Sequence, residues 1–259
     1  MDVEPEFGFG AIRSPPDDRD YQIAAFLPTE HQREILPPEL DLRLQLPPVR
    51  NQGGRGTCAA HAGALVKEYQ ERIDANYLGY MSPEFIYQNR EGKPQSVGMY
   101  GRDVMRILSN IGSVSEDDCP YQDKDNDMTE EQLKALAPIA ENYKIVSYAA
   151  VTTEDELKHA LHTWGPCWVA FPVFKHRPEF WRGEQGEEPY AGHAVAIVGY
   201  TADGYWIRNS WGAGFGTGGY VLWSRADWGR QWEIWSLVDQ RGSPTPPIKC
   251  GKCGNCEVM

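Results

Sequence analysis

The chain has 259 residues, and its 25 basic and 37 acidic side chains give a formal net charge of −12. That length is enough for one large domain or for two lobes that share a core. The acidic balance argues against a nucleic-acid binder, which needs a basic face, and no apolar run approaches the roughly 18 to 20 residues of a membrane span. The N-terminal stretch MDVEPEFGFG lacks the basic and apolar regions of a secretory signal, so we expect reduced cysteines.

Helical patterns dominate the first half of the chain. Residues 1–37 are an extension that contains SPPDD and little helical periodicity. A helix is predicted from Cys58 to about Ala75, because apolar residues recur there on one face. Further helix signals predict a helix from Ser82–Pro83 to Tyr87, one from about Arg102 to Ile111, and two that start at capping boxes, formed by Thr129 with Gln132 and by Thr153 with Glu156.

Short β-rich runs dominate the second half, from about residue 143. Glycine or proline bounds them, and they read YKIVSYAAV, PCWVAFPVF, HAVAIVGY, GYWIRNSW, GYVLWS and IWSLV. The order of patterns favours an α+β protein with a mainly helical lobe at 38–142 and a mainly β lobe at 143–242. A tail at 243–259 begins Pro-rich and then carries CGKCGNC.

The stretch QGGRGTC, residues 52–58, delivers a cysteine to the start of the longest predicted helix. A thiol attacks as its thiolate, and the N–H groups and dipole of a helix N-terminus favour that anion. The glycines allow the backbone to turn tightly and to approach a substrate closely. Cys58 is therefore a candidate nucleophile; the alternative is a small apolar residue that packs at a helix start.

Two later segments carry residues that suit a thiol nucleophile. GHAVAIVGY contains His193, and WIRNSWGAGFGTGGY contains Asn209. These residues lie about 130 to 150 positions beyond Cys58. Together with QGGRGTC, the two segments resemble the papain-like cysteine peptidases over about residues 38 to 240, and the bacterial and large-virus members more than the animal cathepsins.

The resemblance implies a papain-like two-lobed fold, with a helical left lobe, a β-barrel-like right lobe and the active site in the cleft between them. His193 would take the proton from Cys58 and later return it to the leaving amine. Asn209 would orient the imidazole, as the third member of a triad does. The side-chain amide of Gln52 and the N–H of Cys58 would form the oxyanion hole.

The resemblance also implies a set of substrate-binding residues. Gly98, Met99 and Ala194 would shape the main specificity pocket, and Trp211 would line the cleft and cover the Asn–His hydrogen bond from water. Arg55 departs from the pattern of the family, because several members have a disulfide-bonded cysteine there.

The function implied is a cysteine endopeptidase that hydrolyses protein or peptide substrates through a thioester acyl-enzyme, as a monomer, without a cofactor or metal. The alternatives are another thiol acyl-transfer enzyme, such as an amidase or a transferase, and an inactive binding protein on the same scaffold. Residues 1–37 would be a short pro-segment that inhibits the enzyme. The three tail cysteines lack a nearby fourth ligand for structural zinc. A cytoplasmic or virion-associated location is favoured.

Overall fold

The structure is a computed structural model that describes residues 7–27, 35–93, 95–122, 124, 127–175 and 178–238. The tail at 243–259 lies outside these residues. In chain order the elements are β1 (Ala11–Ile12), the 3-10 helix η1 (Ile23–Ala25), β2 (Leu40–Asp41), η3 (Arg43–Gln45), α1 (Cys58–Ala75), α2 (Pro83–Gln88), β3 (Met99–Tyr100), α3 (Gly101–Asn110), α4 (Glu130–Ala140), η4 (Glu141–Tyr143), β4 (Ser147–Ala150), α5 (Glu154–Trp164), β5 (Cys167–Val173), β6 (Ala191–Tyr200), β7 (Gly204–Arg208), β8 (Tyr220–Ser224), η5 (Arg225–Asp227) and β9 (Glu233–Val238).

Local signals start and stop the helices where the sequence predicts. The Ser82 hydroxyl caps α2 by accepting from the Phe85 N–H at 3.0 Å. The helices α4 and α5 each begin with a complete capping box. Helix α3 ends before Gly112, whose φ of +96° suits a glycine at a helix end. These helix predictions are confirmed to within about two residues.

Seven of the described strands form one antiparallel sheet. Its order is β4-β9-β5-β6-β7-β8, and β2 pairs with β6 beside this path. The glycine-rich stretch after Asn209 connects β7 to β8, as a loop between strands. Strands β4 and β8 are the ends of the order, so the expected barrel-like lobe is an open sheet in the described residues.

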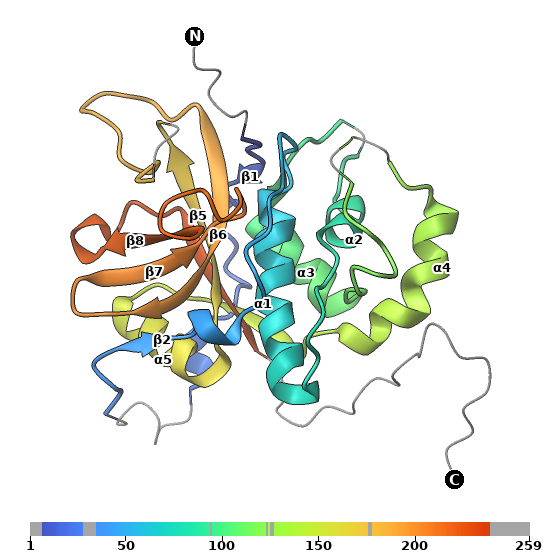
Figure 1. The fold of residues 1–259 in the computed structure, drawn as a ribbon, viewed down its shortest axis with the longest axis horizontal. Coiled ribbons are helices and arrows are strands. Elements are labelled where there is room, and N and C mark those ends of the chain that lie inside the picture. The colour runs from blue at the N-terminus through green and yellow to red at the C-terminus, as the bar shows by residue number, and fades with distance from the viewer. Residues whose placement is uncertain are drawn as a thin grey trace.

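Helix α1 lies between the sheet and the helices α2 and α4, whereas α5 lies on the side of the sheet (Figure 1). One core joins α1 and α3 to the sheet through Trp168, Ala196 and Trp235. The Trp168 Nε1 donates to the carbonyl oxygen of Ala59 at 3.0 Å, which ties β5 to the first turn of α1. A second core contains residues of α5 and of the sheet. Almost all faces of α1 are therefore buried, beyond the single apolar face that the sequence predicts.

The N-terminal segment, defined here as residues 7–27, is part of the fold. Its strand β1 pairs in parallel with β3, with Ala11 opposite Met99. Further along, the Ile23 side chain is completely buried in the core that also holds residues of α5. Figure 1 shows this blue segment at the junction between the sheet and α1. The segment therefore runs where the two halves of the molecule meet.

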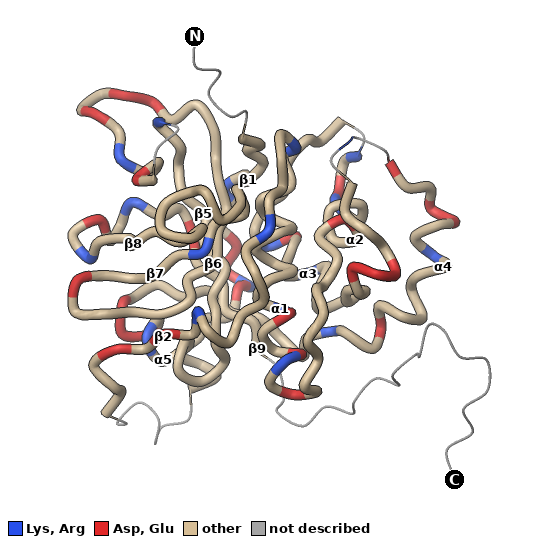
Figure 2. The backbone as a smooth tube through the Cα atoms, viewed as in Figure 1, with Lys and Arg blue, Asp and Glu red and all other residues tan. Residues whose placement is uncertain are grey.

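Charged residues are spread over both halves. Figure 2 shows acidic stretches on α4 and on the long loop between β5 and β6, with basic residues interspersed. None of the described helices is long and apolar enough to cross a membrane.

Candidate active site

Cys58 is the first residue of α1 and is fully buried. The loop before it needs its glycines: Gly53 has a φ of +63°, and a Cβ on Gly56 would lie 2.4 Å from the Val97 carbonyl oxygen. Thr57 does not cap the helix, and its Oγ1 lies 2.9 Å from the Tyr121 hydroxyl oxygen. The first N–H groups of α1 therefore remain beside the thiol.

His193 lies in β6 and faces Asn209, which follows β7. The Nε2 of His193 is 2.8 Å from Asn209 Oδ1, which also accepts from the Ser210 N–H at 2.7 Å. Because an amide oxygen can only accept, Nε2 carries the proton and Nδ1 keeps its lone pair. Trp211 stacks on the imidazole, with ring centroids 4.1 Å apart. The Nδ1 is buried without a hydrogen-bond partner among the described residues, so it remains available as a base.

The side chain of Gln52 is fixed at both ends of its amide. Its Oε1 accepts from the Ser210 hydroxyl at 2.5 Å. Its Nε2 donates to the Arg55 carbonyl oxygen at 2.8 Å and to the Gly8 carbonyl oxygen at 3.0 Å. One donor of Gln52 therefore points at a peptide carbonyl of the N-terminal segment.

The N-terminal segment crosses the site that these residues surround. The Gly10 carbonyl oxygen accepts from the Met99 N–H at 2.8 Å, and the Phe9 ring meets the His193 ring edge-on at 5.8 Å. Burial raises the pKa of the Cys58 thiol, and the backbone N–H groups of Gly10 and Ala11 offset part of this rise. Peptide backbone of the N-terminal segment therefore lies beside the sulfur.

The four residues predicted to bind substrate surround Cys58 and this segment. A Cβ on Gly98 would lie 3.1 Å from the Ile12 side chain, and Met99 pairs with Ala11. The backbone N–H of Ala194 offsets part of the rise that burial causes in the pKa of the Cys58 thiol. Trp211 stacks on Phe7, with centroids 4.4 Å apart. Their contribution to substrate choice stays a prediction.

Residues 36–235 match the family model of papain family cysteine proteases. The chain belongs to this family. Xylellain, a cysteine protease from Xylella fastidiosa, is similar in structure with a TM-score of 0.76 and 26% identity, covering 92% of this chain and 98% of that one. Procathepsin L2 from the larval midgut of Tenebrio molitor has the same fold, with a TM-score of 0.69 at 22% identity, covering 90% and 78%.

A cathepsin L-like proteinase of Phaedon cochleariae is 30% identical over 186 residues, which are 67% of this chain and 55% of the relative. The chain therefore spans about half the length of that relative. Membership of the papain family confirms the predicted α+β fold and makes the chain a cysteine peptidase, a hydrolase of peptide bonds.

Burial suppresses ionisation in the covered site of this peptidase. Desolvation raises the pKa of the Cys58 thiol, and nearby N–H groups lower it less. Desolvation also lowers the pKa of His193 to about 3, although the hydrogen bond to Asn209 acts in the opposite direction. A neutral thiol and a neutral imidazole are therefore favoured, and the expected thiolate–imidazolium pair is not favoured while the segment covers the site.

His61 lies one turn along α1 and serves packing. Its Nδ1 is 3.1 Å from the Thr57 carbonyl oxygen, its ring contacts Tyr121 edge-on at 4.6 Å, and burial lowers its pKa to about 3. Sequence reasoning missed the contacts that Ser210 and Tyr121 make with Gln52. For Ser210 the one signal was its place directly after Asn209; Tyr121 lies in an irregular stretch without a signal.

Proposed function

We propose that Cys58 is the nucleophile of the peptidase reaction and that His193 is its base. The thiol gives its proton to His193 Nδ1, and the sulfur forms a bond to the carbonyl carbon of the peptide. The imidazolium then passes the proton to the leaving amine as the C–N bond breaks. Water hydrolyses the thioester and restores the thiol. Asn209 keeps the imidazole in the tautomer that leaves Nδ1 unprotonated.

The observation that carries this proposal is the hydrogen bond from Gln52 to the Gly8 carbonyl oxygen. A side-chain donor with a fixed orientation lies in the loop that leads to Cys58 and already binds a peptide carbonyl. A donor held in this way stabilises the oxyanion that forms when a carbonyl is attacked, and losing one such donor typically lowers kcat by about 10²- to 10³-fold. The same contact supports a peptide as the substrate.

The substrate would follow the path that residues 7–12 take in this structure. There the main chain can hydrogen-bond to Met99, as Gly10 does. Extended peptides gain affinity from such main-chain bonds and specificity from the pockets between them. We therefore propose an unfolded or loop segment of a protein as the substrate class.

Treatment of the full chain with an E-64-type epoxide, followed by mass spectrometry, tests the nucleophile. We expect labelling of Cys58, loss of labelling in Cys58→Ala, and cleavage of a peptide library by the wild type alone. Labelling of other cysteines without Cys58 would support the inactive scaffold. Acyl transfer to an added amine in preference to water would support a transferase.

We also propose that the N-terminal segment inhibits the enzyme. Its backbone occupies the substrate path, and its burial of Cys58 and His193 favours their neutral forms. Departure of the segment would admit water, lower the pKa of the thiol and raise that of the imidazole. Uncovering would therefore allow substrate entry and formation of the ion pair together.

Gly10→Ala in the full chain tests this inhibition. A Cβ at Gly10 would lie 1.8 Å from the Gly56 carbonyl oxygen, so the segment cannot keep its position. We expect peptide cleavage to rise several-fold. Gly214→Ala is the control, because a Cβ there meets nothing within 4 Å. Unchanged cleavage by Gly10→Ala would contradict inhibition by the segment and would leave the role of Cys58 intact.

A further inference from the structure

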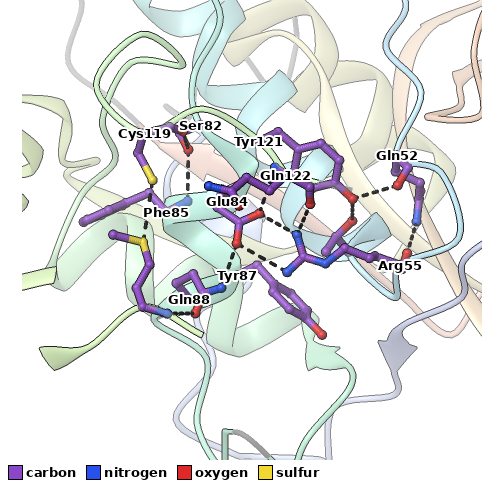
Figure 3. A network of polar contacts seen from close by, with 12 residues as sticks. Gln52, Arg55, Ser82, Glu84, Phe85, Tyr87, Gln88, Cys119, Tyr121 and Gln122 are labelled. Carbon is purple, nitrogen blue, oxygen red and sulfur yellow. Dashed lines mark hydrogen bonds and ion pairs between the residues drawn. The ribbon is translucent and has the colours of Figure 1, made fainter. Parts of the chain in front are cut away.

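Arg55 lies in the loop before Cys58 and forms a buried ion pair with Glu84 of α2. Its Nη1 donates to Glu84 Oε2 at 2.6 Å and its Nη2 to Oε1 at 3.3 Å. The two side chains are only 5% and 4% exposed. Figure 3 shows the pair at the centre of a polar network that runs from α2 to Gln52. A charge pair removed from water thus joins the loop of the nucleophile to α2.

The polar atoms of this pair also make further contacts. Arg55 donates to the Gln122 carbonyl oxygen, and its guanidinium lies 5.4 Å from the centroid of the Tyr121 ring. Glu84 accepts a further bond from Gln88 Nε2 at 2.7 Å. A buried ion pair tolerates the loss of water only with such additional bonds, and these bonds restrict it to one geometry. Arg55 is therefore held at a defined position.

The backbone of Arg55 in turn holds the amide of Gln52. The Arg55 carbonyl oxygen accepts from Gln52 Nε2 and from the Thr57 N–H, both at 2.8 Å. The two hydrogens of a primary amide have a fixed geometry, so an acceptor on one sets the direction of the other. That other hydrogen points to the Gly8 carbonyl oxygen. The position of the Arg55 carbonyl therefore decides where Gln52 donates in the site.

Tyr121 supports the same loop from a second side. Its hydroxyl donates to the Gln52 carbonyl oxygen at 2.7 Å and lies 2.9 Å from Thr57 Oγ1. Figure 3 shows Tyr121 between Gln52 and Arg55. Removing this hydroxyl would loosen the loop without leaving a charge unpaired.

We infer that the Arg55–Glu84 ion pair, assisted by Tyr121, positions Gln52 as the oxyanion donor of this peptidase. This inference rests on the proposed role of Gln52. Arg55 and Glu84 do not touch the reacting atoms in this arrangement and act through Gln52. Misplacement of a catalytic group by about 1 Å can lower a rate about a hundredfold, so a small movement of Arg55 is enough to matter.

Two reactions of the same thiol separate positioning from stability. Cleavage of a peptide amide passes through an oxyanion. Alkylation of Cys58 by iodoacetamide forms an S–C bond and releases iodide without one. Both need an uncovered thiol, so the uncovered fraction cancels in the ratio of kcat/KM to the alkylation rate constant. We expect Arg55→Lys and Glu84→Gln to lower this ratio about tenfold to a hundredfold, through kcat rather than KM, and Tyr121→Phe to lower it less.

A double-mutant cycle with Gln52→Ala tests whether the pair acts through Gln52. In the Gln52→Ala chain, Arg55→Lys should lower the ratio by less than about twofold, because the donor that it positions is absent. Full additivity of the two effects would overturn the inference. The inference would also be overturned if Arg55→Lys and Glu84→Gln lowered the rates of cleavage and of alkylation by the same factor and Tyr121→Phe left the ratio unchanged.

Glu71→Gln is the matched control, because it breaks a buried ion pair between two residues of α1. Lys67 and Glu71 lie 2.7 Å apart on α1, with side chains 1% and 10% exposed. We expect a lower thermal midpoint and an unchanged ratio. An unchanged ratio in Gln52→Ala would overturn the proposed role of Gln52 itself. A reduced ratio there with unchanged ratios in Arg55→Lys and Glu84→Gln would overturn only the positioning role.

Discussion

Arg55 illustrates how a single residue changes the way a site is supported. It occupies a position where several papain-like peptidases have a disulfide-bonded cysteine. An ion pair with Glu84 links the loop to α2 here, and the described cysteines, Cys58, Cys119 and Cys167, are unpaired thiols. An ion pair needs no oxidant to form. The loop that carries Gln52 can therefore keep its shape in a reducing environment.

Asn209→Ala is expected to lower kcat about a hundredfold or more at neutral pH, by analogy with triads that lose their orienting residue. Without Oδ1 the imidazole loses the acceptor that keeps the proton on Nε2. Steady-state cleavage of a peptide by the full chain measures the effect.

The control for this variant is Asn142→Ala. The Asn142 amide donates to the Pro138 carbonyl oxygen in the exposed 3-10 helix η4 that follows α4. Cleavage by Asn142→Ala should match that of the wild type. A loss of less than about threefold in Asn209→Ala would show that another group orients His193.

At the scale of elements, the N-terminal segment is held by more than its short strand. The Arg102 side chain on α3 donates to both carboxylate oxygens of Asp20, at 2.8 and 2.5 Å, and to the Pro15 carbonyl oxygen at 2.7 Å. The Ser14 hydroxyl accepts from the Arg102 N–H at 3.1 Å. A two-residue strand gives little stability alone. This anchor therefore contributes to keeping the segment over the site.

Asp20→Asn should raise the rate of peptide cleavage several-fold, because it removes the charge that pairs with Arg102. A charge-assisted bidentate bond is replaced by a weaker neutral one, so the segment leaves the site more often. The same preparation should show faster alkylation of Cys58 by iodoacetamide.

Arg19→Ala is the matched control for Asp20→Asn. The Arg19–Asp17 pair joins two residues of the segment to each other, and the Arg19 side chain is 83% exposed. We expect its cleavage rate to equal that of the wild type. Equal rates for Asp20→Asn and the wild type would show that Asp20 does not anchor the segment.

At the scale of the whole molecule, the site lies where two packed halves bury titratable groups. His61 and His193 both have a pKa lowered to about 3 by burial. An imidazole in the unfolded chain titrates near its ordinary value of about 6.5. Between these values the unfolded chain binds more protons than the folded chain. Stability therefore decreases as the pH falls through this window.

Urea unfolding of the full chain between pH 7 and pH 4 tests this expectation. Each buried imidazole should contribute a slope of up to about 1.4 kcal/mol per pH unit below about pH 6. Glu68 acts in the opposite direction, because burial raises the pKa of its carboxyl. His61→Gln removes one imidazole and isolates its share from that of Glu68. An identical slope in His61→Gln and the wild type would contradict a buried neutral His61.

Much of the fold was predictable because its signals are local. The capping boxes of α4 and α5, the serine before α2 and the glycine after α3 act within one helical turn. The strands are bounded by local turn residues in the same way. That the sheet stays open was not predictable, because the strand order depends on which strands become neighbours, and β9 lies between β4 and β5.

The sequence by itself determined the family, the fold class and the candidate residues Cys58, His193, Asn209 and Gln52, because these depend on local motifs in a fixed order. The tertiary structure alone decided that residues 8–11 lie beside the thiol and that Arg55 pairs with Glu84. It also decided that burial favours neutral forms of Cys58 and His193. Such contacts join residues that are distant in the chain, and desolvation depends on everything packed around a group. Neither long-range contacts nor desolvation produces a periodic or local pattern in the sequence.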